Sequence, residues 1–335
     1  MLAAVVVWFL VELFQPFTGD GSGRVVVTIP KGASVSEVGD VLAEQQVVSS
    51  SFFFQLRATL SGDRGDIRAG TYHLKKDMSY GSVLSILTKA PAAAPTTEIT
   101  ITPGRTRRQI DSLLRGQGVS GSYYAATRSS PLLKPTAYGA PRGTNSLEGF
   151  LFPDTYQLTD PVRLSALIGD QLTDFKRQFA TVDMRFARSH HISAYEVLTV
   201  ASMIEGEAQK ASDRPLVASV IYNRLRLGMR LQIDATTCYI ANTNPCRLTQ
   251  SLLNSPSPYN TRIHKGLPPT PIDNPGLAAI QAAAHPAHTN YLYFVVLPCG
   301  NGKEVFDSTL AQFQRDSRRY QSARAKNGGR SPAHC

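Results

Sequence analysis

A weak internal repeat constrains the fold of this chain more than any other feature of its sequence. Residues 27–47 (VTIPKGASVSEVGDVLAEQQV) align with residues 99–119 (ITITPGRTRRQIDSLLRGQGV). Further along, GTYHL at 70–74 is echoed by DTYQL at 154–158. Each copy therefore predicts a strand–helix–helix–strand unit, so that the same unit occurs twice in the chain. The predicted fold class of the chain is α+β, with small α+β modules in the front half.

Each copy also carries the signals that start its first helix. Ser34 and Thr106 are typical N-cap residues, and Glu37 and Gln109, three positions later, complete a capping box in each case. Neither copy holds a cluster of titratable side chains. We therefore interpret the two modules as binding or spacer elements.

The length and composition agree with more than one domain. The chain has 335 residues and is 42% hydrophobic and 18% charged, which excludes wholesale disorder. The pattern predicts a membrane anchor at 1–17, a first module at 25–90, a second repeat at 97–160, a mainly helical domain with long loops and a few strands at 161–322, and a tail at 323–335.

The first residues of the chain are strongly apolar. From Met1 to Phe14 the only charged residue is Glu12, and the first cation is Arg24. This run is shorter than the ~20 residues that cross a bilayer, and a buried helix of a soluble protein would have similar letters. No cleavage signature follows it. We predict an uncleaved anchor whose cytoplasmic flank is missing or cropped.

The net charge favours an anionic partner. Thirty-five Lys and Arg against 25 Asp and Glu give a formal charge of +10, which suits nucleic acid, a membrane surface or a cell wall. The cations are spread along the chain rather than interleaved with aromatic residues, so we predict no nucleic-acid partner.

The four cysteines suggest an exported body. Cys238 and Cys246 bracket a short loop that could close a disulfide, and Cys299 and Cys335 could form a second one. Other pairings, or four free thiols, remain open at this point.

The rear half is helical and then rich in loops. Amphipathic patterns predict helices at 160–179, 194–210 and 213–227, followed by Pro-, Asn- and Thr-rich loops up to residue 276. A helix at 277–284, a strand at 291–297 and a basic tail from Arg315 complete the prediction.

The second of these helices contains a carboxylate with a chemical case. On a helical wheel at about 100° per residue, Glu205 falls between Ala201 and Leu198, inside the apolar stripe. Glu196 and Glu207 fall on the opposite, solvated side. A carboxyl group on a core-facing stripe loses hydration, and this favours the neutral form that a general acid needs.

The alternative for Glu205 is structural, namely a pair at the edge of the stripe with Arg224 or Arg230. Other chemistries have less support. His285 and His288 are three apart, but a Pro and the lack of a nearby carboxylate argue against a metal site, so no metal is predicted. By the wheel, Glu205 and Glu207 project to opposite sides and cannot act as a two-carboxylate hydrolase pair.

Nine ordered motifs carry a resemblance to a known family. They are SLEGFLFPDTY (146–156), ASMIEGE (201–207), VASVIYNRL (217–225), MRLQIDAT (229–236), SPYNT (257–261), GLPP (266–269), NPG (274–276), AHPA (284–287) and YLYF (291–294). Together they resemble the YceG-like family of endolytic murein transglycosylases over nearly the whole chain. The resemblance implies a LysM-like front module and a catalytic domain at 161–322.

The resemblance also implies an activity. Members cut the MurNAc–GlcNAc bond of peptidoglycan without water and leave 1,6-anhydro-MurNAc ends, which would limit the length of nascent glycan strands. Glu205 matches the catalytic glutamate of the family. Further motif positions are candidates for substrate binding: Glu148, Asn223, Gln232, Asp234, Thr236, Tyr259, Asn260, Thr261 and His285.

The sequence departs from the family pattern at Glu304, where members usually carry a His. The resemblance implies no cofactor. Pyridoxal phosphate would need a lysine beside a phosphate-cradling Gly loop, and neither Lys210 nor Lys265 has one.

The implied setting is a single-pass cell-membrane protein with its body on the extracytoplasmic side. Its partners would be peptidoglycan glycan strands, the membrane and, as candidates, peptidoglycan synthases. The alternative function is a non-catalytic protein that binds peptidoglycan and anchors to the wall. A buried acid at Glu205 separates the two hypotheses, because a binding protein has no need of one.

Overall fold

The computed structural model describes residues 1–16, 18–89, 95–242 and 246–333. Two compact units divide the chain, Met1–Ala94 and Pro95–Cys335. Both mix helices with two-stranded antiparallel sheets, so the α+β class holds for each.

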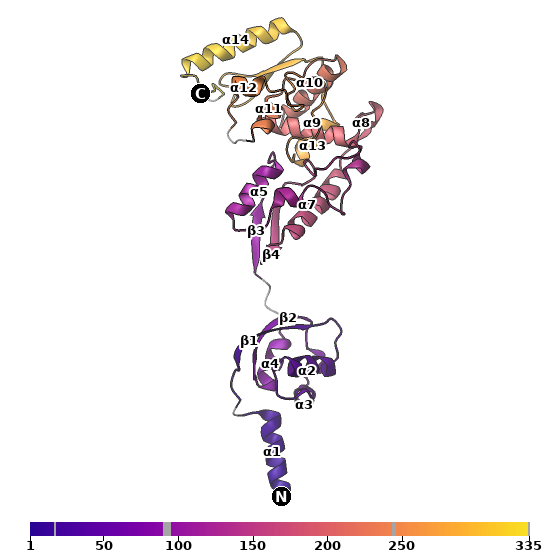
Figure 1. Ribbon diagram of the computed structural model, residues 1–335, viewed down its shortest axis with the longest axis vertical. Helices are drawn as coiled ribbons and strands as arrows, with labels where there is room; N and C mark the ends of the chain where they lie inside the picture. The colour runs from indigo at the N-terminus through magenta and orange to yellow at the C-terminus, as the bar shows by residue number, and fades with distance from the viewer. Residues whose placement is uncertain (17, 90–94, 243–245, 334–335) are drawn as a thin grey trace. The chain divides into compact units, whose positions relative to one another are not determined.

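Unit 1 is built on one strand pair, β1 with β2, in which Val27 lies opposite Tyr72. The helices α2 and α3 pack on one another, and the core gathers Leu42, Phe54 and Leu74. In chain order its elements are α1 (Leu2–Phe14), β1 (Ser22–Ile29), α2 (Val35–Glu44), α3 (Ser51–Ser61), β2 (Gly70–Lys76) and α4 (Tyr80–Leu87), as Figure 1 shows.

The helix α1 lies within the predicted anchor segment, residues 1–17. It has 13 residues, and no helix in the described part of the chain combines the length and the apolar character that a membrane crossing needs. Phe9 of α1 lies against Phe53 of α3, with ring centroids 5.5 Å apart, and the Gln15 side chain accepts a hydrogen bond from the Tyr80 main-chain N–H. The anchor stays a prediction.

Unit 2 contains the second strand pair, most of the helices and a third strand pair. Its first elements are β3 (Thr96–Thr100), α5 (Arg107–Gly116), α6 (Tyr123–Ala126), β4 (Thr155–Thr159), α7 (Leu164–Phe179) and α8 (Arg185–Ser189). The remaining ones are α9 (Ala194–Glu207), α10 (Arg214–Arg226), α11 (Asp234–Ala241), α12 (Gln250–Leu253), α13 (Leu277–Ala284), β5 (Tyr293–Val296), β6 (Glu304–Asp307) and α14 (Leu310–Lys326).

The helix α9 lies at the centre of unit 2. Every residue from Val197 to Ile204 is buried, and α10, α11 and α13 all pack against it. The predicted capping box, in which Ser193 and Glu196 exchange hydrogen bonds, is confirmed. The sequence predicted that only one apolar stripe of this helix is buried. The buried surface is wider, because other elements enclose the helix on nearly all sides.

The repeat predicted from the sequence corresponds to similar local structures. Both strand pairs are antiparallel, and both predicted capping boxes, at Ser34 with Glu37 and at Thr106 with Gln109, are present. The surroundings differ. The first copy has its own core, whereas Ile99, Ile110 and other residues of the second copy belong to the large core that includes α9.

Two sequence predictions need correction in unit 2. The segment 228–276, expected to be loops, contains α11 and α12. The expected basic tail from Arg315 is largely the helix α14, which begins with a capping box at Thr309 and Gln312.

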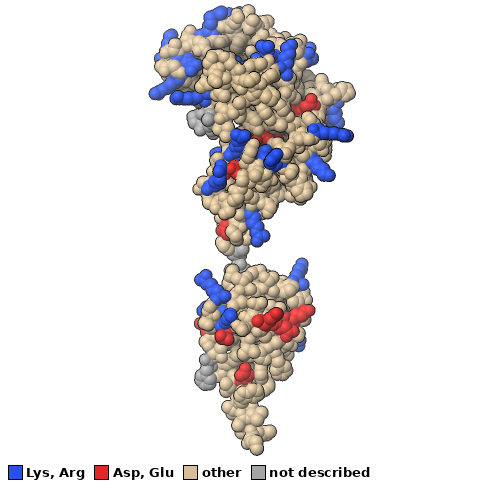
Figure 2. Space-filling view, viewed as in Figure 1, with Lys and Arg blue, Asp and Glu red and all other residues tan. Residues whose placement is uncertain are grey.

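Blue side chains of Lys and Arg outnumber red acidic ones on the visible face of unit 2 in Figure 2.

Candidate active site

Glu205 lies in the last turn of α9, and its side chain is 12% exposed. Its Oε2 accepts a hydrogen bond of 3.0 Å from the Gly276 main-chain N–H, and its Oε1 lies 3.7 Å from a guanidinium nitrogen of Arg214. The arginine expected in the structural alternative was Arg224 or Arg230. The structure instead brings Arg214 to the carboxyl, while the Arg224 guanidinium donates to main-chain carbonyls.

The loop 272–276 delivers the Gly276 N–H to Glu205. Its first residue is fixed one turn earlier on the same helix, where the Ser202 hydroxyl accepts a 3.0 Å hydrogen bond from the Ile272 N–H. Because Ser202 and Glu205 are three positions apart, they share a face of α9. The loop therefore follows the helix up to the carboxyl group.

Asn274, in the middle of this loop, is a hub of hydrogen bonds. Its side-chain oxygen accepts from the Gly149 and Leu151 N–H groups at 2.9 and 3.1 Å. Its amide nitrogen donates to Glu148 Oε1 and to the Arg105 carbonyl at 2.9 and 3.0 Å. One buried side chain thus ties the loop beside Glu205 to the second repeat copy.

Glu148, a substrate-binding candidate, is buried and occupied by protein partners. Its Oε1 also accepts from the Arg107 main-chain N–H at 2.9 Å, and its Oε2 accepts from the Tyr239 hydroxyl at 3.3 Å. Burial raises the pKa of the Glu148 carboxyl to about 7, against the lowering effect of these hydrogen bonds. All of these partners are protein groups, so the contacts of Glu148 support the structure around the site.

Gly104 leaves the space in which two carboxyl groups approach each other. It has φ +80°, and a Cβ placed there would lie 3.6 Å from Glu205 Cγ and 3.9 Å from Asp273 Oδ2. Burial, with Glu205 and Glu148 nearby, raises the pKa of the Asp273 carboxyl well above its ordinary value. Asp273 was not among the residues predicted from the sequence, because no periodic pattern marks a loop residue as buried.

A cavity of about 610 Å³ opens beside these groups. Gly206, next to Glu205 in the chain, lines it together with Gly104 and Asp273. The rest of its wall comes from the turn before α5, the end of α9 and the loop after it, and from α5, α11, β5 and β6. It includes Arg105, Glu207, Gln209, Asp234, Tyr239, Phe294, Val296 and Glu304. Its size is that of an ordinary ligand pocket.

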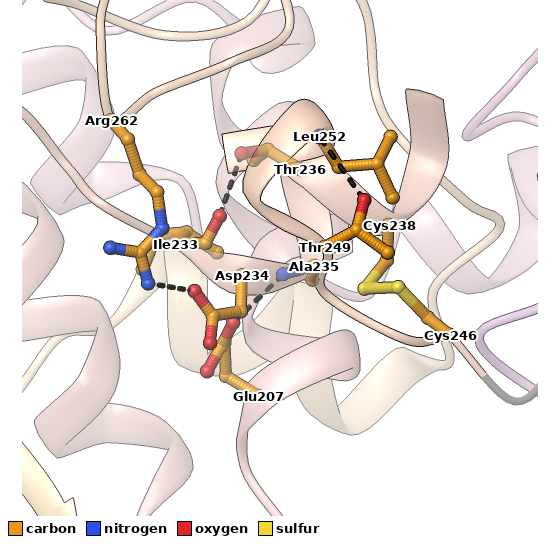
Figure 3. The surroundings of a disulfide bond; sticks show 10 residues. All are labelled: Glu207, Ile233, Asp234, Ala235, Thr236, Cys238, Cys246, Thr249, Leu252 and Arg262. Atoms are coloured by element: carbon orange, nitrogen blue, oxygen red, sulfur yellow. Dashed lines mark hydrogen bonds and ion pairs between the residues drawn. A yellow bond between two sulfur atoms is a disulfide. The ribbon is translucent and has the colours of Figure 1, made fainter. Parts of the chain in front are cut away.

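The prediction that Glu207 is a solvated helix acid is wrong. The first turn of α11 lies over that side of α9, and the Ala235 N–H donates to Glu207 Oε1 at 3.1 Å (Figure 3). Burial raises the pKa of the Glu207 carboxyl to about 7. A Cβ on Gly206 would lie 2.7 Å from Ala235 Cβ, so glycine is what allows this close approach.

The helix α11 is also where a predicted disulfide lies. Cys238 and Cys246 are bonded, with their Cα atoms 5.6 Å apart, and Figure 3 shows the bond near Glu207 and Asp234. This pairing is confirmed. The second predicted pair, Cys299 with Cys335, includes residue 335, which lies outside the described residues.

Of the predicted binding residues, Asp234 lines the cavity, and Thr236 and Thr261 lie at the start of α11 beside it. Asp234 also pairs with Arg262. Thr236 and Thr261 are buried and share a 2.9 Å hydrogen bond, and the Thr261 hydroxyl accepts from the Ile233 N–H. These two threonines hold the start of α11 in place.

Three further candidates support loops. Asn260 is buried and donates to the Leu253 and Ser255 carbonyls. The Tyr259 hydroxyl shares a 2.9 Å hydrogen bond with the Thr270 hydroxyl. Gln232 has an exposed side chain, and its main-chain N–H donates to the Thr261 carbonyl.

Asn223 and His285 are not gathered at Glu205. Asn223 lines a separate cavity and donates to the Thr289 and Tyr291 carbonyls at 2.9 and 3.0 Å. His285 follows the far end of α13, about 12 Å of helix from Gly276, and lies 3.5 Å from Asp183. Among the described residues, no three or more His, Cys, Asp and Glu side chains form a group that could hold a metal ion.

The sequence of the chain assigns it to a known family. The model of the YceG-like family matches residues 27–319, which is most of the chain. The chain belongs to the YceG-like family.

Curated proteins to which the chain is similar come from two genera. The endolytic murein transglycosylase of Bacillus subtilis (strain 168) is 33% identical over 326 residues, covering 93% of this chain and 89% of that protein. The protein of the same name from Streptococcus pneumoniae serotype 2 is 28% identical over 341 residues, covering 91% and 61%. A crystal structure of a YceG-like protein from Listeria monocytogenes matches with a TM-score of 0.57 and 28% identity, covering 87% of this chain and 98% of that one.

Proposed function

We propose that this protein is an endolytic murein transglycosylase, a lyase that cuts peptidoglycan glycan strands internally. The observation that carries the proposal is the nearly buried Glu205 carboxyl, whose neighbours Gly206 and Gly104 line a cavity of about 610 Å³, in a chain that belongs to the YceG-like family. The name shared by the Bacillus and Streptococcus relatives supports the same activity.

In the proposed reaction Glu205 acts twice. As a neutral acid it donates its proton to the glycosidic oxygen while the bond from that oxygen to the MurNAc anomeric carbon breaks. The C6 hydroxyl of the same MurNAc then attacks the anomeric carbon, and the Glu205 carboxylate takes the hydroxyl proton. The products are a 1,6-anhydro-MurNAc end and a free GlcNAc hydroxyl. No water is consumed, and Glu205 returns to its starting form.

Neighbouring groups suit the carboxylate form of Glu205. Between the two steps it is a carboxylate, and both the Gly276 N–H and the Arg214 guanidinium interact favourably with that charge. The nearby Asp273 is buried, and burial, with Glu205 and Glu148 close by, raises the pKa of its carboxyl and so favours the neutral form. A neutral Asp273 is a poor nucleophile, so a second carboxyl group near Glu205 does not by itself indicate a hydrolase.

The proposed setting is the outer face of the cell membrane. The apolar helix α1 would belong to a single-pass anchor, and the 25–90 module would be a LysM-like element that contacts glycan. Cutting nascent strands there would limit their length. Peptidoglycan synthases, which make those strands, are the proposed protein partners.

Mass spectrometry of purified sacculi after digestion tests the activity. We expect products with anhydro ends, lighter by one water than hydrolysis products. Reducing ends throughout would mean a hydrolase. Retention of the protein on sacculi without any released product would instead support the non-catalytic wall-binding alternative.

A further inference from the structure

Glu304 is a buried carboxyl group that has no role in the mechanism above. It is the first residue of β6, paired with Val296 of β5, and is 7% exposed. Its main-chain N–H donates to Asp213 Oδ2 at 3.0 Å. Its side-chain Oε2 is buried, and within the described part of the chain it has no hydrogen-bond partner. A buried polar atom without a partner costs free energy, so a ligand that supplies one is favoured.

The position of Glu304 indicates which ligand it faces. Glu304 lines the cavity that is also lined by Gly104 and Asp273, and a Cβ on Gly104 would lie 3.6 Å from Glu205 Cγ. Tyr239 and Phe294 line the same cavity and provide aromatic surface. A carboxyl group together with aromatic rings offers both hydrogen bonds and apolar contact, which a sugar ring can use on its edge and its face.

The charge state of Glu304 favours a neutral partner. Burial, with the acids Glu207 of α9 and Asp213 before α10 nearby, raises the pKa of the Glu304 carboxyl to about 8. At neutral pH the group is mostly a neutral acid, which can both donate and accept a hydrogen bond. An uncharged hydroxyl or acetamido group matches that pattern.

We propose that Glu304 is a substrate-binding residue, whose side chain hydrogen-bonds to a hydroxyl or acetamido group of the sugar that occupies the cavity beside Glu205. The proposal rests on the proposed transglycosylase function, because that function supplies the glycan.

The test compares Glu304→Leu, which removes the hydrogen bond, with Glu304→Gln, whose amide donates and accepts as the neutral acid does. Affinity for peptide-free glycan strands is measured in a Glu205→Gln background, where no turnover occurs. We expect Glu304→Leu to bind about tenfold more weakly, the loss of one hydrogen bond. Glu304→Gln should stay within about twofold of its parent.

A matched control lies at the other end of the same strand. Asp307 is also buried, and its Oδ2 is also without a partner among the described residues, but it does not line the cavity. Asp307→Asn should leave affinity unchanged. In the active enzyme Glu304→Leu should raise KM about tenfold with little change in kcat, and its melting temperature should not fall, because no protein contact of the carboxyl is lost.

Two outcomes would overturn the proposal. Unchanged affinity and KM in Glu304→Leu would mean that the carboxyl does not touch the glycan. Equal weakening in Glu304→Gln and Glu304→Leu would mean that an ionised carboxylate contacts a cationic group instead. Failure of the proposed function is a separate result, since it would appear as wild-type protein that produces no anhydro ends.

Discussion

The two copies of the repeat share a capped helix start, and they differ in the kind of residue that follows the helix cap directly. In unit 1 this position is Val35, which joins the apolar core of its own module. In unit 2 it is Arg107, which is 4% exposed and donates to Thr127, Ser146 and the Tyr124 carbonyl. One local design thus closes a self-contained module in the first copy and supports a buried polar network in the second.

The glycine turns that precede these two helices also differ in their surroundings. Gly32 and Gly104 have φ +83° and +80°, but a Cβ on Gly32 would meet nothing within 4 Å, whereas one on Gly104 would reach Glu205 and Asp273. Backbone conformation is therefore shared by the two copies, while the chemistry belongs only to the second. The predictions below test this division.

The largest effect is expected from Glu205→Gln. The variant keeps the size of the side chain and cannot donate or recover a proton, so turnover should fall at least ~10²–10⁴-fold while glycan binding survives. Release of anhydro products from sacculi measures it. Glu196→Gln, on the same helix and able to keep the capping box, is the control. Full activity in Glu205→Gln would place the catalytic group elsewhere.

Asn274→Ala should destabilise unit 2 and leave unit 1 unchanged. It removes four hydrogen bonds to buried groups, and we expect a loss of about 3 kcal/mol in the free energy of unfolding of unit 2. Hydrogen exchange followed by mass spectrometry resolves the two units. Asn254→Ala, which removes an exposed contact to Gln250, should cost less than about 0.5 kcal/mol. An equal loss in both units would contradict the division.

The two units should also respond to pH with opposite signs. The pKa of Glu148 is about 7 in the folded state against 4.5 ordinarily, so the folded state binds the proton more tightly. Unit 2 should therefore be most stable below about pH 4.5 as far as this group is concerned, and should lose about 3 kcal/mol as the pH rises from about 4.5 through 7. In unit 1, the Ser34 N–H lowers the pKa of Glu37, so its contribution is lost as the pH falls.

Hydrogen exchange at several pH values measures this difference. Glu148→Gln should flatten the dependence in unit 2, because the amide does not titrate. An unchanged pH slope in that variant would show that another of the buried acids, such as Glu207 or Glu304, dominates it.

The smallest effect is expected from the paired glycine variants. Gly104→Ala and Gly32→Ala both force an L residue into positive φ, so each should lower the stability of its own unit by about 1 kcal/mol. Only Gly104→Ala fills the space beside the Glu205 carboxyl, and its activity should fall about tenfold. Comparable activities in the two variants would separate Gly104 from the site.

Local signals in the sequence predicted much of this architecture. The capping boxes at Ser34, Thr106 and Ser193, the helix at 277–284 and the disulfide Cys238–Cys246 were all readable, because each depends on residues close together in the chain. The wheel also found Glu205. It misplaced Glu207, because the partner that buries it, Ala235 of α11, comes from a segment expected to be a loop.

The sequence by itself determined the local elements and the position of a carboxyl group on a largely apolar helix, since periodicity and capping act over a few residues. Only the tertiary structure decided which groups surround that carboxyl. Gly276 and Asp273 are distant from Glu205 along the chain and Arg214 lies on the next helix, and no periodic pattern records such contacts. Burial by other elements sets their hydrogen bonds and the raised pKa values of Asp273 and Glu304, so these properties arise from packing.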